Sequence, residues 1–411
     1  MFPEDSILAD YVKYAREQVE GADAYILGSI LPVCSALLGR RVYIQWGDTR
    51  KYPNLFCMLA GKAGDRKSSS IKLAEALAYE CLPPEAFLPQ SFSPETLFDE
   101  YDEVNGGCPD KLWIVDDANA TLKDWQKTRN GERVATRFLQ LYDCGRLSES
   151  FRRNKQGENG KPRRFIEETS TSLVFGATFN ICAFQGQAIR AGLARRFLYY
   201  LADAHGRLIT RPQRFKRLDQ IAHLFRWLIG FNMEIDFSPE AGKLWNILQL
   251  DKRKRIQTAD SLNETLLSRL NSAPMQTLSI AIIFEACRVA HGQCELGALS
   301  KTSLELAIIH VEECLAAADA LESIANRATL ESEAEIVFAR VRRDFASRMQ
   351  NGSITLSKTD LTSRYCRHGW RDKLRPEVLY HKLIPVLIRQ NRVRLLCKEG
   401  KREMYAFRAD N

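Results

Sequence analysis

The sequence predicts an α/β fold in which helices cover both faces of a parallel sheet. Between residues 71 and 209, apolar strand-like runs alternate with helical periodicity, which is typical of such a sheet. Residues 55–60 (LFCMLA) and 112–115 (LWIV) are apolar throughout, as expected of strands buried on both faces. The first run leads through a glycine-bearing loop into a helix, residues 71–80 (IKLAEALAYE).

The loop that follows the first strand has the spacing of a phosphate-binding loop. In Gly-x4-Gly-Lys-Ser/Thr, backbone N–H groups surround the phosphates, the Lys reaches the β and γ phosphates and the hydroxyl binds Mg²⁺. Gly61, Lys67 and Ser68 match, but Arg66 replaces the second glycine, so we expect the loop to turn there without a positive φ. A chance loop is the alternative, and the flanking strand and helix disfavour it. The residues expected to bind ATP are Gly61, Gly64, Arg66, Lys67, Ser68 and Ser69.

Two carboxylates end the second apolar run. In open α/β sheets, ligands bind at the carboxyl ends of the strands. We therefore expect Asp116, together with Ser68, to hold Mg²⁺, and Asp117 to polarise the attacking water. The alternative is that the pair simply ends a core strand, and the phosphate loop about fifty residues upstream favours the catalytic interpretation. Because Asp is shorter than the Glu of many motor ATPases, we expect slow turnover.

Composition excludes several classes of protein. The chain has 411 residues, 45% hydrophobic and 27% charged, without repeats or low-complexity tracts. Its eleven Cys form no pair of zinc-site spacing, so we expect reduced thiols, no structural metal and a cytoplasmic protein. The acidic start lacks a signal-peptide pattern, and the most apolar stretch, residues 25–39, is too short to span a bilayer.

The net charge of +8 is unevenly distributed. Residues 333–411 hold 18 Lys and Arg against 9 Asp and Glu, a net of +9, whereas residues 1–332 have a net charge of −1. A basic C-terminal module indicates a polyanionic partner, most simply DNA. The alternative is that Arg-rich helical surfaces serve only solubility.

Four domains are predicted from the order of these patterns. Residues 1–50 form an N-terminal helical collar, 51–212 the nucleotide-binding core, and 213–332 a helical lid. Residues 333–411 contain three helical segments, with capping-box spacing at Ser357 and Asp360 and a first-turn Pro376, followed by a hairpin around residues 399–400. Three helices and a two-stranded wing predict a winged-helix domain, in which Pro385 kinks or shortens the third helix.

A basic hairpin is predicted for residues 146–164, which hold seven Lys and Arg and two Glu. Lysines flank its Gly/Asn-rich tip and arginines lie nearer its base, so the segment suits phosphate contacts with DNA. A solvated charged loop is the alternative. The candidate DNA-binding residues are Arg152, Arg153, Lys155, Lys161, Arg163 and Arg164.

Further polar residues follow the next two strands. Thr178 and Asn180 end the run at 172–180 and could lie between the two catalytic strands and orient the water, or could simply begin a turn. Arg196, and after it Arg195, could stabilise the transferring phosphoryl group of a neighbouring subunit. Either arginine could instead pair with a surface carboxylate, and Arg269 could reach the nucleotide of its own subunit.

In this order, the motifs resemble those of helicase-like ATPases from phages, plasmids and mobile elements, which are related to the superfamily 3 and minichromosome-maintenance helicases of the AAA+ class. The resemblance covers residues 10–320 and is strongest at 53–70 and 185–200. It implies an AAA+-like P-loop NTPase fold, a hexameric ring, hydrolysis of ATP with Mg²⁺ at subunit interfaces and translocation on DNA. It also implies phosphate and Mg²⁺ roles for Lys67 and Ser68, Walker B roles for Asp116 and Asp117, and a trans finger at Arg196.

Two functions fit these features. The first is an ATP-driven DNA helicase or translocase of a mobile element, working on single-stranded or forked DNA with replication or mobilisation proteins. The second is a nucleotide-gated DNA-binding or loading factor with little unwinding activity. A small-molecule kinase is disfavoured, because the basic hairpin and tail would have no role in it.

Overall fold

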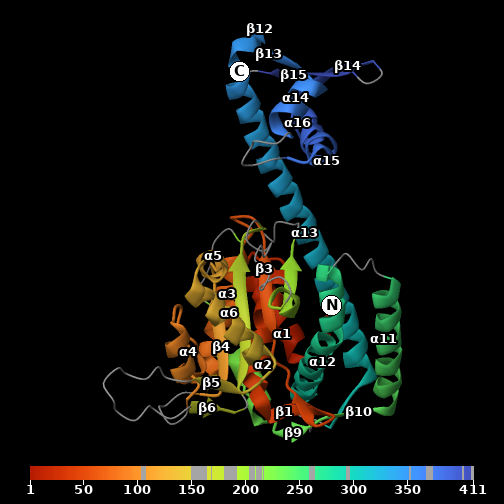
Figure 1. The fold of residues 1–411 in the computed structure, drawn as a ribbon. Coiled ribbons are helices and arrows are strands. Elements are labelled where there is room, and N and C mark those ends of the chain that lie inside the picture. Colours follow the sequence, from red (N-terminus) through yellow and green to blue (C-terminus); the bar gives the residue numbers. More distant parts are fainter. Residues whose placement is uncertain are drawn as a thin grey trace. The chain divides into compact units, whose positions relative to one another are not determined.

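The computed structural model describes the chain except for residues 103–107, 150–163, 168, 180–191, 203–208, 210–214, 216, 259–263, 293–296, 351–352, 367–373, 400–401 and 409–411. It contains two compact units, Met1–Leu321 and Glu322–Asn411 (Figure 1). Helix α13 (Lys301–Asp344) contributes residues to both. Among the described residues, no helix combines the length and the apolarity that crossing a membrane requires.

A four-stranded parallel sheet lies at the centre of the first unit. Its strand order is β4 (Asp110–Val115), β7 (Ser170–Ala177), β3 (Phe56–Ala60) and β8 (Phe197–Leu201). Phe56 pairs with Leu173 on one side and with Phe197 on the other. All five residues of β3 are buried, because helices cover both faces of the sheet. The predicted mixed α/β fold with a parallel sheet is thereby confirmed.

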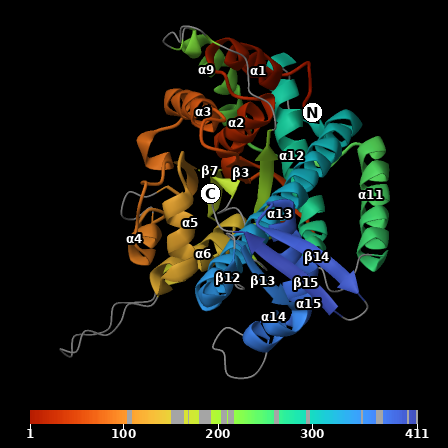
Figure 2. The ribbon, with the colours of Figure 1, turned by 90° about the horizontal axis from the view of Figure 1, so that it is seen from above.

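Alternate strand residues face two different hydrophobic clusters. Cys57 and Leu59 lie in the cluster that includes α1 (Ile7–Gln18), α2 (Asp23–Leu38), α3 (Lys67–Cys81) and α12 (Glu264–Gly292). Phe56 and Met58 face the other way, toward α4 (Pro94–Asp99), α5 (Asn119–Lys127) and α6 (Arg129–Tyr142). This division follows from the two-residue period of a strand. Figure 2 shows these helix layers from above.

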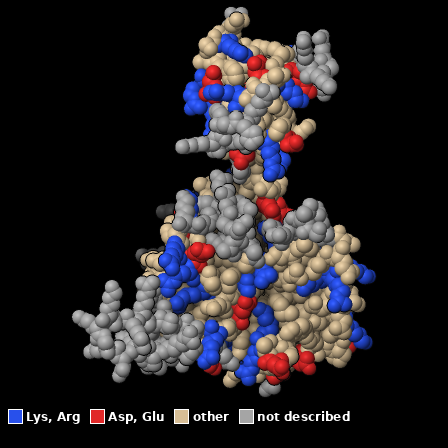
Figure 3. Space-filling model, in the orientation of Figure 1, with Lys and Arg blue, Asp and Glu red and all other residues tan. Residues whose placement is uncertain are grey.

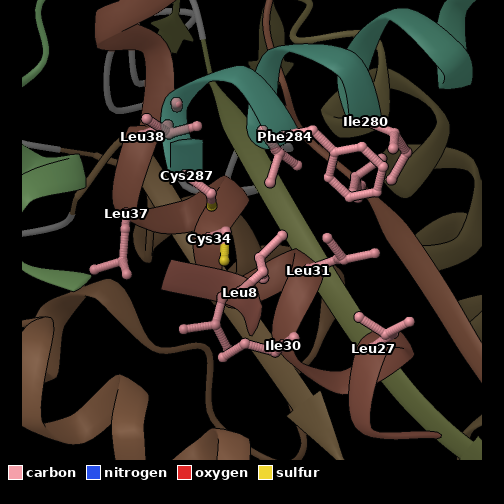
Figure 4. Packing of buried hydrophobic residues seen from close by; sticks show 14 of the residues in the cluster. Leu8, Leu27, Ile30, Leu31, Cys34, Leu37, Leu38, Ile280, Phe284 and Cys287 are labelled. Carbon is pink, nitrogen blue, oxygen red and sulfur yellow. The ribbon is translucent and has the colours of Figure 1, made fainter. Parts of the chain in front are cut away.

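Helix α2 lies inside the core and not in a separate N-terminal collar. Every one of its residues from Tyr25 to Leu38 is buried, and it packs on β3, β7 and β8. Figure 4 shows Leu31 and Cys34 of α2 facing Phe284 and Cys287 of α12. A helix that is apolar on all sides is stable only when neighbours surround it, and residues 1–50 therefore belong to the same compact unit as the sheet.

The predicted lid region is mostly helical and belongs to the same compact unit up to Leu321. Two small sheets accompany its helices, one of strand order β2-β1-β9 and one pairing β10 with β11. The bounds of these elements are β1 (Val42–Trp46), β2 (Thr49–Lys51), α9 (Leu218–Phe225), α10 (Trp227–Gly230), β9 (Met233–Glu234), β10 (Asp236–Phe237), α11 (Pro239–Thr258) and β11 (Ala298–Leu299).

The second unit combines the end of α13 with short helices and a four-stranded sheet of order β12-β13-β15-β14. The predicted capping box forms, with reciprocal hydrogen bonds between Ser357 and Asp360. The predicted C-terminal hairpin is also present, as β14 paired with β15. The bounds are β12 (Met349–Gln350), β13 (Ser353–Ser357), α14 (Lys358–Tyr365), α15 (Pro376–Val378), α16 (Ile384–Arg389), β14 (Val393–Glu399) and β15 (Arg402–Arg408).

Pro385 affects the helix in the way its chemistry predicts. A π-helical turn, η6 (Leu379–Leu383), separates α15 from α16, and Pro385 stands in the first turn of α16. Since proline has no N–H to donate to the carbonyl four residues before it, the regular hydrogen-bond ladder cannot continue through this point.

Candidate active site at the ends of β3, β7 and β4

The carboxyl ends of three strands bring the predicted catalytic segments together. Because β7 lies between β3 and β4 and all three are parallel, the segments that follow them meet at one edge of the sheet. Gly61 N donates to Ala177 O at 3.2 Å, and Ala118 N donates to Gly176 O at 2.8 Å. These bonds join the loop after β3 and the Asp-Asp segment after β4 to the end of β7.

The loop before α3 turns through a left-handed residue. Arg66 is the N-cap of α3 and has φ 60° and ψ 21°. Our expectation that the loop turns without a positive φ is therefore wrong: Arg66 adopts the conformation that glycine has at the lowest cost. The Lys67 ammonium folds back over the loop and donates to Lys62 O at 2.7 Å. Lys62 N donates to the Asp65 carboxylate, which braces the same turn.

Gly61 leaves no room for a side chain. A Cβ at this position would lie 2.5 Å from Tyr25 Oη, 2.7 Å from Asp65 Oδ2 and 3.2 Å from Lys67 Nζ. The Tyr25 hydroxyl donates to Ala60 O at 2.8 Å, which fixes it beside the loop. A side chain at this position would therefore have to displace the ends of these three neighbouring side chains.

Asp116 carries an unsatisfied acceptor at this edge. Its Oδ1 atom is buried and has no hydrogen-bond donor among the residues that the structure describes. A buried carboxylate oxygen without a partner is costly unless a cation or water satisfies it. Burial, followed by the nearby Asp116 carboxylate, raises the pKa of Glu75, so this α3 residue adds a second acidic group that the motif did not reveal. The carboxylate oxygens at this edge are donors of the kind that fits Mg²⁺, which prefers oxygen ligands.

Asp117 and Thr178 are joined through Asn119. The exposed Asp117 accepts from Asn119 N at 3.1 Å, and the Asn119 side-chain oxygen accepts from Thr178 N at 3.1 Å and from its hydroxyl at 3.2 Å. Sequence reasoning missed Asn119, although its backbone N–H stands at the position, two residues after Asp117, that an Asp side chain typically accepts from when it closes a turn. Asn180, the other predicted sensor, lies outside the described residues.

The first unit contains an open cavity away from the strand ends. It has a volume of about 840 Å³ and lies between α1 and α9, with Gln18, Ile209 and Arg217 in its lining. Glu20, which does not line the cavity, links one lining residue to the loop: its carboxylate pairs with Arg66 Nε at 2.7 Å and accepts from Ile209 N at 2.9 Å. Glu20 was also missed, since no local pattern links the end of α1 with the loop.

The two candidate finger arginines differ in their surroundings. Arg196 is buried, pairs with the Asp143 carboxylate and donates to Gly192 O at 2.9 Å. Arg195 is half-buried and has no ion-pair partner among the residues that the structure describes. The pair between Arg196 and Asp143 is the structural alternative that the sequence left open. Arg269 is also buried and pairs with Asp319 at 3.2 Å.

Only the base of the predicted basic hairpin is described. β5 (Leu147–Glu149) pairs antiparallel with β6 (Arg164–Ile166), and Glu149 is opposite Arg164. Arg152, Arg153, Lys155, Lys161 and Arg163 lie outside the described residues. The two strands agree with a hairpin, and the DNA-binding role of these residues stays a prediction.

Within the described residues, no group of three or more His, Cys, Asp or Glu is arranged to hold a metal ion by itself. Comparison of the chain with models of known protein families and with curated proteins gives no match.

Proposed function

We propose that the chain is an ATP-dependent DNA helicase or translocase of a mobile genetic element, built on an AAA+-like P-loop fold with a C-terminal winged-helix domain. The observation that supports it best is the edge shared by β3, β7 and β4. There, backbone hydrogen bonds to the end of β7 hold both the loop of Lys67, at Gly61, and the segment of Asp116, at Ala118. The buried Oδ1 of Asp116 has no donor among the described residues.

In this proposal each group has a defined task. The loop N–H groups and Lys67 bind the phosphates, in line with the closely packed glycine before them. Ser68 and Asp116 would hold Mg²⁺, which supplies neutralisation of the phosphate charge. Asp117 polarises the water, and Asn119 with Thr178 keeps that carboxylate in place.

The cavity between α1 and α9 suits the nucleoside part of ATP. One of its lining residues, Ile209, is linked through Glu20 to Arg66 of the loop, and its volume of about 840 Å³ is within the usual range of small-molecule sites. Gln18, Gln220 and Arg217 provide polar groups for a base or ribose, and Ile221 and Leu224 provide apolar contact.

Two further features complete the proposal. We propose a cytoplasmic hexameric ring in which Arg195 or Arg196 reaches the neighbouring site. We also propose that the hairpin at 146–164 and the basic C-terminal unit hold single-stranded or forked DNA. The charge distribution supports this, because the whole positive excess lies beyond residue 332.

The decisive experiment is DNA-stimulated hydrolysis of ATP. We expect stimulation by single-stranded or forked DNA in the wild type and its loss in Lys67→Ala. The matched control is Lys62→Ala, because Lys62 lies in the same loop with an exposed side chain and contributes through its backbone. Calorimetry that detects no ATP binding by folded wild-type protein would overturn the proposal.

A nucleotide-gated loading factor is the second candidate, and one observation favours it. Arg196 is already engaged by Asp143 in the same chain, which removes the first-choice finger from the neighbouring site. ATP binding without strand separation would support this candidate. Deletion of residues 333–411 should then abolish recruitment to DNA and leave the residual hydrolysis unchanged.

A further inference from the structure

Three large apolar side chains lie far out on the surface of the first unit. Ile247 is 61% exposed, and Leu250 and Tyr79 are each 60% exposed, which makes them the most exposed large apolar side chains among the described residues. The first two lie on α11 and the third lies on α3. Covering such side chains with a partner removes apolar surface from water and is favourable.

On α11, the two aliphatic side chains lie between two lysines. Lys243, Ile247, Leu250 and Lys254 are spaced by four, three and four residues, so they line one face of the helix. Both lysines are exposed, and neither has an ion-pair partner among the residues that the structure describes. Figure 3 shows Lys and Arg within uncharged surface at the right side of the first unit, where Figure 1 places α11. These four residues are called the α11 face below.

On α3, the exposed tyrosine has an aromatic partner and acidic neighbours. The Tyr79 ring stacks on that of Phe87, which follows η2 (Pro84–Ala86), with centroids 4.4 Å apart. Glu75 lies one helical turn before Tyr79, and Glu85 lies two residues before Phe87. Neither carboxylate has an ion-pair partner among the described residues. Glu75, Tyr79, Glu85 and Phe87 are called the α3 face below.

Charges of the opposite sign border each face without interrupting it. Glu240 and Asp251 are exposed on one flank of the α11 face, and the exposed Arg253 lies on the other flank. Lys72 is exposed one turn before Glu75. In both faces, apolar side chains therefore have charged neighbours, which are cations on α11 and carboxylates on α3.

The two faces belong to opposite ends of one helix layer. Helix α3 packs on α2, α2 packs on α12, and α12 packs on α11. Figures 1 and 2 agree that α11 lies at one side of the first unit, whereas α3 and α4 lie toward the other. The two faces of one chain thus point to different neighbours.

We infer that the α11 face of one copy of this chain packs on the α3 face of the next copy. The aliphatic pair covers the Tyr79 ring and the two lysines reach the carboxylates beside it, so apolar contact and opposite charge coincide. A second copy is the partner because one chain carries both halves of this contact. Since the faces differ, the contact is heterologous and repeats from copy to copy. It rests on the proposed function only for its closure into a hexamer.

The test measures the mass of the full chain by sedimentation velocity over a range of concentrations, without nucleotide. The wild type should form species larger than a dimer. Ile247→Glu with Leu250→Glu should weaken association about tenfold or more, because it removes the apolar contact and places two carboxylates against an acidic face. The matched control, Ile336→Glu with Ile388→Glu, replaces two exposed isoleucines of the second unit and should retain wild-type assembly.

A mixing experiment tests whether the two faces are partners. Tyr79→Lys disables the α3 face and keeps the α11 face, whereas the double variant at Ile247 and Leu250 does the reverse. Each should be monomeric alone. Together they should form 1:1 dimers and nothing larger, because each mixed pair has one intact contact. Dimers of this kind also show that both variants are folded.

Three results would overturn the inference. The first is a wild type that stays monomeric at about 100 μM, a hundredfold above a micromolar Kd. The second is wild-type assembly by either face variant. The third is a mixture of folded variants that stays monomeric while the wild type assembles.

Calorimetry with ATP separates these results from the proposed function. A wild type that binds ATP but never assembles would refute the contact and leave the nucleotide site standing. A wild type that assembles through these faces but takes up no ATP would refute the ATPase and leave the contact standing.

Discussion

Arg66 Nε lies 2.7 Å from Glu20 Oε2, so an ion pair joins the loop before α3 to the end of the first helix. The other Glu20 oxygen accepts from Ile209 N at 2.9 Å. One carboxylate therefore holds three chain segments that are far apart in sequence. Arg66 occupies the position of the motif's second glycine and has a left-handed conformation, which costs a non-glycine residue about 1–2 kcal/mol.

The backbone strain at Arg66 leads to the first prediction. Arg66→Ala should destabilise the fold, because the strained conformation stays while the ion pair is lost. Arg66→Gly also loses the pair but relieves the strain, so its free energy of unfolding should exceed that of Arg66→Ala by about 1 kcal/mol. Urea denaturation compares the two. Equal stability would show that the loop does not keep its left-handed turn in solution.

The close packing around Gly61 leads to the second prediction. Gly61→Ala should weaken ATP binding about tenfold or more, because the new Cβ would displace Tyr25 Oη, Asp65 and Lys67 Nζ. Adding Tyr25→Phe removes the nearest of these atoms and should restore part of the affinity. Isothermal calorimetry of both variants, with Tyr25→Phe alone as control, measures the effect. A double variant no better than Gly61→Ala would mean that the hydroxyl does not limit the space.

Much of the fold follows from periodicity along the chain. The strands over 56–60 and 112–115 were predicted because those residues are continuously apolar, and helix α3 because it begins at the phosphate loop; β4 itself starts earlier, at the charged Asp110 and Lys111. The position of α2 was not predictable in the same way. Its residues are apolar on all sides, which indicates burial, but the pattern does not specify that β3, β7 and β8 provide the cover.

The candidate site divides along similar lines. Lys67, Asp116 and Thr178 each follow an apolar strand. Because the carboxyl ends of parallel strands meet at one edge of the sheet, the sequence predicted that these residues come from neighbouring segments. Glu20, Asp65, Asn119 and Glu75 were missed, because each acts through a partner that the chain brings close only after folding. The long-range ion pair at Arg66 offsets only part of the cost of its left-handed backbone, because the arginine side chain is largely exposed.

The ion pair between the buried Arg196 and the exposed Asp143 carboxylate leads to the third prediction. Arg196→Ala should lower the free energy of unfolding by about 1–2 kcal/mol, mainly because Gly192 O loses its donor, while the exposed Asp143 carboxylate is solvated again by water. Arg195→Ala, the neighbouring control, should cost less than about 0.5 kcal/mol. Thermal or urea unfolding of both variants checks this difference.

The same two variants also distinguish an arginine that acts in the active site of a neighbouring subunit from one with a purely structural role. If Arg195 reaches a neighbouring site, mixing Arg195→Ala with Lys67→Ala should partly restore hydrolysis, because mixed oligomers contain some complete sites. If Arg196 is structural, its variant should show reduced stability and no rescue on mixing. Rescue by Arg196→Ala at unchanged stability would reverse this assignment.

The buried His310 leads to the fourth prediction, which concerns pH. Its Nδ1 lies 3.1 Å from Met1 O and its Nε2 2.8 Å from Tyr200 Oη. A carbonyl can only accept, so Nδ1 carries the proton and Nε2 accepts from the tyrosine. Burial lowers the pKa of His310 from 6.5 to about 4. The folded protein therefore keeps this ring neutral between pH 6.5 and about pH 4.

The direction of the pH effect follows from proton linkage. The unfolded chain binds a proton at His310 below pH 6.5, whereas the folded chain does so only near pH 4, so acid favours unfolding in between. The free energy of unfolding should fall by about 3 kcal/mol from pH 7 to pH 4 on account of this residue. In His310→Gln this part of the pH dependence should disappear, while His223→Asn, which replaces an exposed imidazole, should retain the wild-type profile. Identical pH profiles for wild type and His310→Gln would show that the ring is not held neutral by burial.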